Sequence, residues 1–167
     1  MKMFKLQKNQ GFGMVEVIVV SAIAAISVVG FGAVARTSLA LLREEKARME
    51  ASLLVEEGFE GVRALRDSSW TANVSTLAND TTYFLATTTV SSLSTWVILT
   101  APQPPINGKY YRTLQFQAVN RDASDRIAAA GAADPGTRKL TVTVSWSSRN
   151  ATSSVDSSGY ITNFMQN

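Results

Sequence analysis

The feature that most constrains this chain is an uncharged, strongly apolar run from Val17 to Ala35. Together with the apolar residues just before it, this run of nineteen residues is about long enough to cross a ~30 Å hydrocarbon core as an α-helix. The segment before it is basic and contains no acid up to residue 11, its charged residues being Lys2, Lys5 and Lys8. Because lysines mark the cytoplasmic flank of a membrane helix, we expect the N-terminus in the cytoplasm and the chain after Arg36 outside it.

Composition excludes several classes of function. The chain has no Cys and no His, which excludes disulfides, thiolate chemistry, Cys/His metal sites and imidazole catalysis. The formal net charge of +3 belongs to the three N-terminal lysines, because the other 13 basic residues balance 13 acidic ones. The charge therefore indicates membrane orientation, and we predict no nucleic-acid partner. No motif indicates catalytic residues, a cofactor or a metal site, so we do not expect an enzyme.

Glu16 stands near the start of the apolar run, where an acid is unfavourable. A charged side chain inside a membrane helix costs roughly 2.5–3.5 kcal/mol on insertion scales, and the segment holds no cation to compensate it. Three ordinary interpretations leave Glu16 unexplained: a plain membrane anchor, a signal peptide and a soluble core helix. The small-x-small site at residues 33–35 favours the signal peptide, but the length of the run and the position of Glu16 oppose it.

The residues around Glu16 resemble a known leader. A short basic segment ends in Gly11, Phe12 follows, and Glu16 precedes the long apolar run. This pattern resembles the class III leader of type IV prepilins and type II secretion pseudopilins. The resemblance implies that prepilin peptidase cleaves the Gly11–Phe12 bond and methylates Phe12. It also implies that Glu16 pairs with the N-terminal amine of a neighbouring subunit, an ion pair that is strong in a dry core only when both partners are well placed.

The resemblance also implies an α+β fold, in which a long N-terminal helix packs against a C-terminal antiparallel sheet to give a pilin-like lollipop. The expected parts are a removed leader at 1–11, a transmembrane and filament-core helix at 12–35, an amphipathic helix continuation at 36–69 and a β head domain at 70–167. Two alternatives stay open for Gly30 and Gly32. Each weakens a helix by up to ~1 kcal/mol relative to Ala and could break it in two, or each permits close helix–helix contact.

The segment from Arg36 to Asp67 has the apolar spacing of one helix face. The residues of this face are Leu39, Leu42, Met49, Leu53, Val55, Phe59, Val62 and Leu65. Gly58 and Gly61 interrupt good helix formers, and they mark either a close approach to a sheet or a weak point. The acids Glu56, Glu57 and Glu60 are interpreted as a charged, solvated helix face rather than as catalytic carboxylates or a metal site.

The C-terminal part alternates with period two, which predicts strands. The expected strands are 96–99, 109–119, 138–146 and 160–164, with turns at Asn107-Gly108 and Asp134-Pro135-Gly136. They form an antiparallel sheet with one buried face, and the apolar side of the 36–67 helix is the expected cover.

Two polar segments of this part contain residue types that could bind a ligand. Residues 120–125 are expected to form a plain turn, because two Asp are too few for a calcium site. For Tyr110, Tyr111 and Arg112, a strand with one tyrosine inward and one outward is favoured over a stacking patch for nucleic acid or glycan.

We therefore expect a structural subunit, a pilin or pseudopilin of a type IV pilus or of a related type II secretion filament. By the resemblance, its partners are prepilin peptidase, other pilin subunits, the inner-membrane assembly platform and the membrane. It would begin as a single-pass precursor in the inner membrane and end in a periplasmic or extracellular filament. The alternative from another class is a membrane-anchored extracytoplasmic binding module, such as an adhesin or a DNA-capture head, with an uncleaved anchor.

Overall fold

The computed structural model describes residues 13–90, 92–148 and 151–165. Its elements are α1 (Met14–Ser68), α2 (Trp70–Asn73), β1 (Thr82–Val90), β2 (Leu93–Leu99), β3 (Tyr110–Arg121), β4 (Ile127–Ala128), β5 (Ala132–Ser148) and β6 (Ala151–Thr162). The chain divides into two compact units, Met1–Arg43 and Glu44–Asn167, and α1 contributes to both. The boundaries expected for a leader and a transmembrane segment stay predictions.

The described part of the first unit is helical. α1 passes through Gly30 and Gly32 without interruption, so a helix broken at these glycines is not what the chain forms. A Cβ at either position would meet no atom within 4 Å. The large apolar side chains of this part are exposed, as Val17, Ile26 and Phe31 illustrate with 57%, 73% and 77% exposure.

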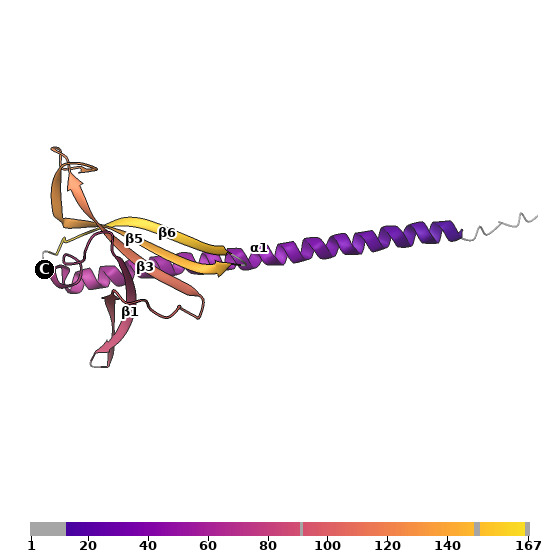
Figure 1. Ribbon diagram of the computed structural model, residues 1–167, viewed down its shortest axis with the longest axis horizontal. Helices are drawn as coiled ribbons and strands as arrows, with labels where there is room; N and C mark the ends of the chain where they lie inside the picture. The colour runs from indigo at the N-terminus through magenta and orange to yellow at the C-terminus, as the bar shows by residue number, and fades with distance from the viewer. Residues whose placement is uncertain (1–12, 91, 149–150, 166–167) are drawn as a thin grey trace, which may run out of the picture. The chain divides into compact units, whose positions relative to one another are not determined.

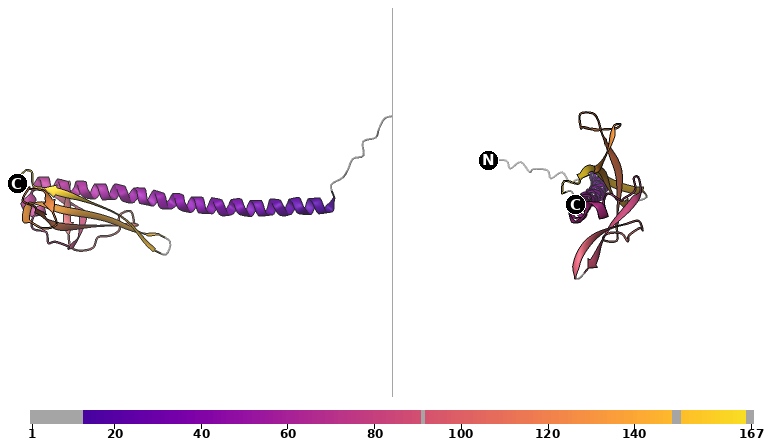
Figure 2. Two further views of the ribbon diagram at one scale, coloured as in Figure 1. Left: turned by 90° about the horizontal axis from the view of Figure 1, so that it is seen from above. Right: turned by 90° about the vertical axis from the view of Figure 1, so that its left-hand side faces the viewer.

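The second unit is a helix-and-sheet layer structure. Its six strands are antiparallel and follow the order β2-β1-β3-β5-β6, with β4 pairing to the end of β3 (Figure 1). The sheet lies along one side of the C-terminal part of α1 (Figure 2, left). The expected α+β class, with a long apolar N-terminal helix packed against an antiparallel sheet, is confirmed.

The central strands follow the predicted alternation. In β5 the residues Leu140, Val142, Val144 and Trp146 are buried, and residues between them are half-buried. In β3 the buried apolar positions before the ladder shift are Tyr110, Leu114 and Phe116. These side chains share one face, which packs against α1 in a single apolar cluster. The cluster joins the two layers because neither could bury its apolar side alone.

The helix face that covers the sheet differs from the predicted one. Val55, Val62 and Leu65 are buried as expected, but Met49 and Leu53 are 64% and 60% exposed. The other residues of α1 that are buried are small: Ala47, Ala51, Gly58 and Gly61. The prediction was wrong at its N-terminal half because the pattern followed side-chain size, whereas close contact with the sheet selects small residues. Leu39 and Leu42, in the first unit, are also exposed.

Gly58 and Gly61 mark a close approach of helix and sheet. A Cβ on Gly61 would lie 2.6 Å from Cδ2 of Leu85, and one on Gly58 would lie 2.8 Å from Cγ1 of Val142. Both distances are shorter than carbon atoms tolerate. Of the two explanations left open by the sequence, the close approach is therefore the one that holds.

The turn at Asn107-Gly108 is confirmed, with φ of 53° and 67° at the two residues. The turn predicted at Asp134-Pro135-Gly136 does not separate two strands, because β5 continues through it. The ladder shifts there: Ala118 pairs with Arg138 but Val119 pairs with Asp134. The three residues between Asp134 and Arg138 thus form a bulge, and Oδ1 of Asp134 accepts the backbone N–H of Gly136 at 2.9 Å.

The largest differences from the expected strand bounds are in β1 and β6. β1 was not predicted, and β6 begins at Ala151 rather than at Tyr160. β1 is rich in Thr, and β6 is rich in Ser and Thr. β6 carries only one fully buried residue, Ile161. β1 alternates over only two buried positions, Tyr83 and Leu85, and such short alternation gives little period-two signal.

Candidate functional site

Three residues carried the sequence prediction of processing and assembly. Gly11 and Phe12 lie outside the residues that the structure describes. Glu16 lies in the first turn of α1 and is exposed. Its backbone N–H donates to the carbonyl of Gly13 at 2.9 Å. Within the described residues, the carboxylate of Glu16 has no hydrogen-bond or ion-pair partner.

The hydroxyl groups of the apolar segment behave differently from Glu16. Ser21 donates to the carbonyl of Ile18 at 2.9 Å, and Ser27 donates to that of Ile23 at 2.8 Å. Thr37, at the end of the segment, donates to a carbonyl four residues before it at 3.0 Å. Bonds of this type satisfy a hydroxyl without water, which suits a helix in apolar surroundings. Glu16 is thus a polar side chain of this segment that, unlike these hydroxyls, has no partner among the described residues.

α1 is long and apolar enough to cross a membrane, and it is the single helix among the described residues with this property. The 18-residue stretch of α1 that is apolar enough to span a membrane has none of its residues buried within the chain. A soluble core helix, one of the ordinary interpretations, would be mostly buried, so this interpretation does not fit.

The second unit has a cavity where its sheet forks. β1 pairs with β3 over only two residue pairs, Thr82 with Gln115 and Tyr83 with Leu114. From Phe84 onward β1 pairs with β2 instead, and the β1–β2 hairpin leaves the plane of β3 (Figure 2, right). The space between the two strands is a cavity of about 340 Å³. We call this space the fork cavity.

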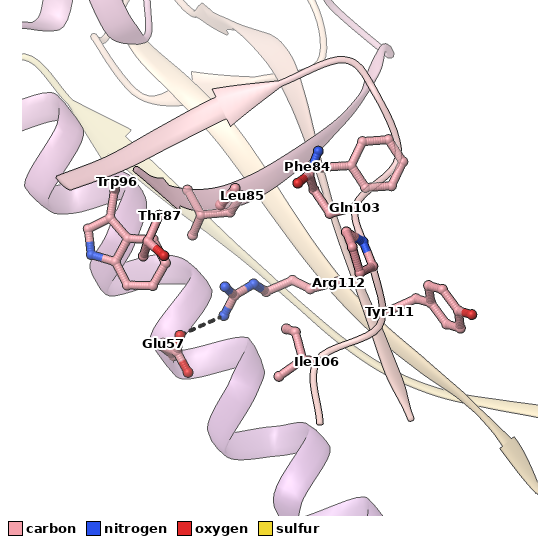
Figure 3. Close-up of a pocket in the computed structure, with 11 residues that line it drawn as sticks. Glu57, Phe84, Leu85, Thr87, Trp96, Gln103, Ile106, Tyr111 and Arg112 are labelled. Atoms are coloured by element: carbon pink, nitrogen blue, oxygen red, sulfur yellow. Dashed lines mark ion pairs between the residues drawn. The ribbon is translucent and has the colours of Figure 1, made fainter. Parts of the chain in front are cut away.

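Arg112 of β3 lies at the base of the fork cavity. It occupies an inward position of its strand, between Tyr110 and Leu114, and only 6% of it is exposed. Its Nη1 donates to the carbonyl of Leu54 at 3.1 Å and lies 3.3 Å from Oε1 of Glu57 (Figure 3). Both acceptors are on α1. A buried cation needs such a partner, since an unpaired charge in the interior is strongly unfavourable.

The other edge of the Arg112 guanidinium is free of protein acceptors. Neither Nε nor Nη2 has a hydrogen-bond partner among the described residues. Nε is enclosed by the protein, so Nη2 is the nitrogen of this edge that a ligand in the cavity can reach. Figure 3 shows the guanidinium between Glu57 and the side chains of Trp96 and Leu85. Its carbon lies 5.6 Å from the centre of the Trp96 ring, within the range of a cation–π contact.

The walls of the fork cavity are mixed in character. Its apolar part comes from β1, β2 and the loop before β3: Phe84, Leu85, Ala86, Trp96, Pro104 and Ile106. Polar groups come from Glu57, Thr87 and Gln103, and Tyr111 stands at the outer end with 51% of its surface exposed. The amide of Gln103 donates to the carbonyl of Ala101 at 2.9 Å, which leaves its oxygen as an acceptor. A cavity of this size and mixture is suited to a small ligand.

The expected orientation of the two tyrosines is confirmed, because Tyr110 is 2% exposed and Tyr111 is 51% exposed.

The three acids Glu56, Glu57 and Glu60 of α1 do not act as one cluster. Glu57 pairs with Arg112, and Glu60 pairs with Arg63 three residues along the helix. Sequence reasoning therefore missed that Glu57 has a separate role. The available signal was Arg112 itself, a charge at an inward position of an otherwise alternating strand.

The polar segment after β3 forms a turn, as expected. Oδ1 of Asp122 accepts the backbone N–H groups of Ser124 and Arg126 at 2.8 and 3.0 Å, and these bonds lower the pKa of Asp122. Arg121 donates through Nε to Asp134 at 2.6 Å. No group of three or more metal-ligating side chains occurs in the part of the chain that the structure describes.

Comparisons with protein-family models, with curated proteins and with solved structures find no significant match to this chain. Function must therefore be argued from the residues and their geometry.

Proposed function

We propose that this chain is a structural subunit, a pilin or pseudopilin, of a type IV pilus or a related type II secretion filament. The observation that carries the proposal is Glu16. Its carboxylate lies near the start of an apolar helix, without a partner among the described residues, whereas the neighbouring hydroxyls bond to their own helix. An acid in apolar surroundings requires a cation, and the amine released by cleavage before Phe12 of a second subunit would supply it.

The proposed pathway has four steps. The basic leader holds the N-terminus in the cytoplasm, and prepilin peptidase cleaves after Gly11 and methylates Phe12. The apolar helix keeps the subunit in the inner membrane. The assembly platform then transfers it into a filament, where Glu16 meets the amine of a neighbour. The role is structural, and catalysis has no part in it.

The experiment that tests processing is N-terminal sequencing with mass spectrometry of the chain from cells that contain prepilin peptidase. The expected N-terminus is a methylated Phe12, and the expected mass lacks residues 1–11. A peptidase-deficient strain serves as the control and should give the intact chain. An N-terminus at Met1 or at Arg36 in the peptidase-containing strain would contradict the proposal.

Assembly is tested with Glu16→Gln, which removes the charge and keeps the size of the side chain. Filament yield should fall about tenfold or more, because the variant leaves the neighbouring amine unpaired. Glu45→Gln is the matched control: it is an exposed acid on the same helix and should assemble at wild-type yield. Equal yields for both variants would show that the pairing role is wrong.

The fork cavity beside Arg112 favours a second candidate, a membrane-anchored binding module with an uncleaved anchor. This alternative predicts an intact N-terminus and no filaments. The sequencing experiment above therefore separates the two.

A further inference from the structure

We propose that the fork cavity between β1 and β3 binds a neutral saccharide, held by Glu57 and Arg112. The cavity has about 340 Å³ of space, within the range of about 300–1,000 Å³ that is typical of small-ligand sites. All of its residues belong to the second unit, so the proposal holds whether the chain forms filaments or remains an anchored monomer.

The first argument is the pairing of a donor with an acceptor. Nη2 of Arg112 offers only donor hydrogens, and the carboxylate of Glu57, whose side chain is 47% exposed, offers only acceptors. A hydroxyl group donates and accepts at once. Two neighbouring hydroxyls can therefore accept from Arg112 and donate to Glu57, which no purely apolar ligand can do.

The second argument is charge. Glu57 already lies 3.3 Å from Arg112 and balances its charge. An anionic ligand would approach Arg112 against the charge of Glu57, and a cationic one would approach Glu57 against that of Arg112. A neutral ligand meets neither repulsion.

The third argument is the form of the walls. Trp96, Leu85 and Ile106 provide an apolar side next to the polar pair, as Figure 3 shows. A sugar ring has C–H faces and a hydroxyl rim, and it matches such a mixed surface.

The test uses the full chain in lipid nanodiscs, without alkyl-glycoside detergents that would themselves occupy the site. Saturation-transfer difference NMR is recorded with glucose, galactose, mannose and N-acetylglucosamine, and with glucuronate as the anionic counterpart. At least one neutral sugar should receive saturation, with contacts at its C–H face. The proposal is overturned if none does at tens of millimolar, or if glucuronate alone binds to the wild type.

Glu57→Gln sharpens the test, because it changes charge at constant shape. The variant should weaken the neutral sugar about tenfold, since a hydrogen bond to a charged acceptor becomes one to a neutral acceptor. It should also strengthen glucuronate, because Arg112 is no longer balanced. Glu60→Gln is the matched control: its carboxylate is one turn away, 68% exposed and paired with Arg63, and it should leave both affinities unchanged.

Two further outcomes decide against the proposal. Binding that Glu57→Gln and Glu60→Gln alter equally would place the sugar elsewhere. Binding of an extended peptide at this cavity, with no binding of any neutral sugar, would identify the wrong ligand class. Circular dichroism of each variant confirms that its fold is intact, since Glu57 is half-exposed and its replacement removes no core side chain.

Discussion

The hydroxyl of Tyr110 on β3 lies 2.5 Å from Oε2 of Glu50 on α1, and 3.3 Å from the carbonyl oxygen of Ala47. The Tyr110 ring is buried and meets Trp146 edge to face, with the ring centres 6.1 Å apart. This side chain therefore both fills the core and bonds the sheet to the helix.

Tyr110→Phe should lower the stability of the second unit without changing its fold. The ring keeps its packing, but the hydrogen bond to Glu50 is lost, and the expected decrease in Tm is a few degrees. Thermal unfolding followed by near-UV circular dichroism measures it. Tyr111→Phe is the control and should not change Tm, because its side chain is half-exposed. The same decrease in both variants would mean that the Glu50 bond contributes nothing.

The same contact should make the second unit sensitive to alkaline pH. Burial, together with the hydrogen bond to Glu50, raises the pKa of Tyr110 above its usual 10.0. The folded state thus holds this proton more tightly than the unfolded state. The resulting stability is fully present below pH 10 and is lost as the pH rises through the folded-state pKa.

Urea unfolding at several pH values checks this dependence. The midpoint of the wild type should fall more steeply above pH 10 than that of Tyr110→Phe, and the two curves should converge. Since every other titrating group is shared, the difference between the curves belongs to Tyr110. Parallel curves across this range would contradict the assignment.

Gly61→Ala should destabilise the second unit, although alanine is the better helix former. Its Cβ would lie 2.6 Å from Leu85 and 3.2 Å from the ring of Trp96. Overpacking of this kind costs about 1–3 kcal/mol, which exceeds the gain of up to ~1 kcal/mol in helix propensity. Urea unfolding measures the difference. Gly30→Ala, which meets no atom within 4 Å, should not lower the midpoint, and a stabilising Gly61→Ala would disprove the close approach.

Arg138→Met should loosen the segment between α2 and β1. Arg138 is 8% exposed, and its Nη2 donates to the carbonyl of Leu77 and to Oδ1 of Asn79, both at 2.9 Å. Unpaired buried acceptors cost about 1–3 kcal/mol. Hydrogen exchange should accelerate in residues 74–80, and the urea midpoint should fall. Lys139→Met, on the next residue of β5, is the control that should leave exchange in this segment unchanged.

Much of the fold could be predicted from the sequence where side chains alternate by type. Leu140 to Trp146 in β5 and Leu114 with Phe116 in β3 follow period two, because one side of each strand is buried. β1 gave only a short signal, from Tyr83 and Leu85, and β6 gave none. Their Ser and Thr residues fit either face of a sheet, so only pairing with a neighbouring strand defines them.

Of the two candidate sites, one could be predicted from the sequence and the other could not. Glu16 was identified because a charged residue inside an apolar segment is unfavourable and can be seen in the sequence alone. The pair of Glu57 and Arg112 was missed, since 55 positions separate the two residues. Their contact depends on how closely α1 approaches β3, which is set by small residues such as Gly58. A pattern based on large apolar residues does not record that distance.

The two sides of α1 within the second unit differ in which property a substitution must preserve. Ala47, Ala51 and Gly61 face the sheet at close range, so their volume matters and even one added methyl group is disruptive. Met49 and Leu53 are large, apolar and exposed, so the fold itself tolerates a polar residue there. Selection for folding would thus keep the residues on the sheet-facing side small. On the exposed side, folding does not restrict the residue type, which can adapt to whatever partner or solvent contacts this helix.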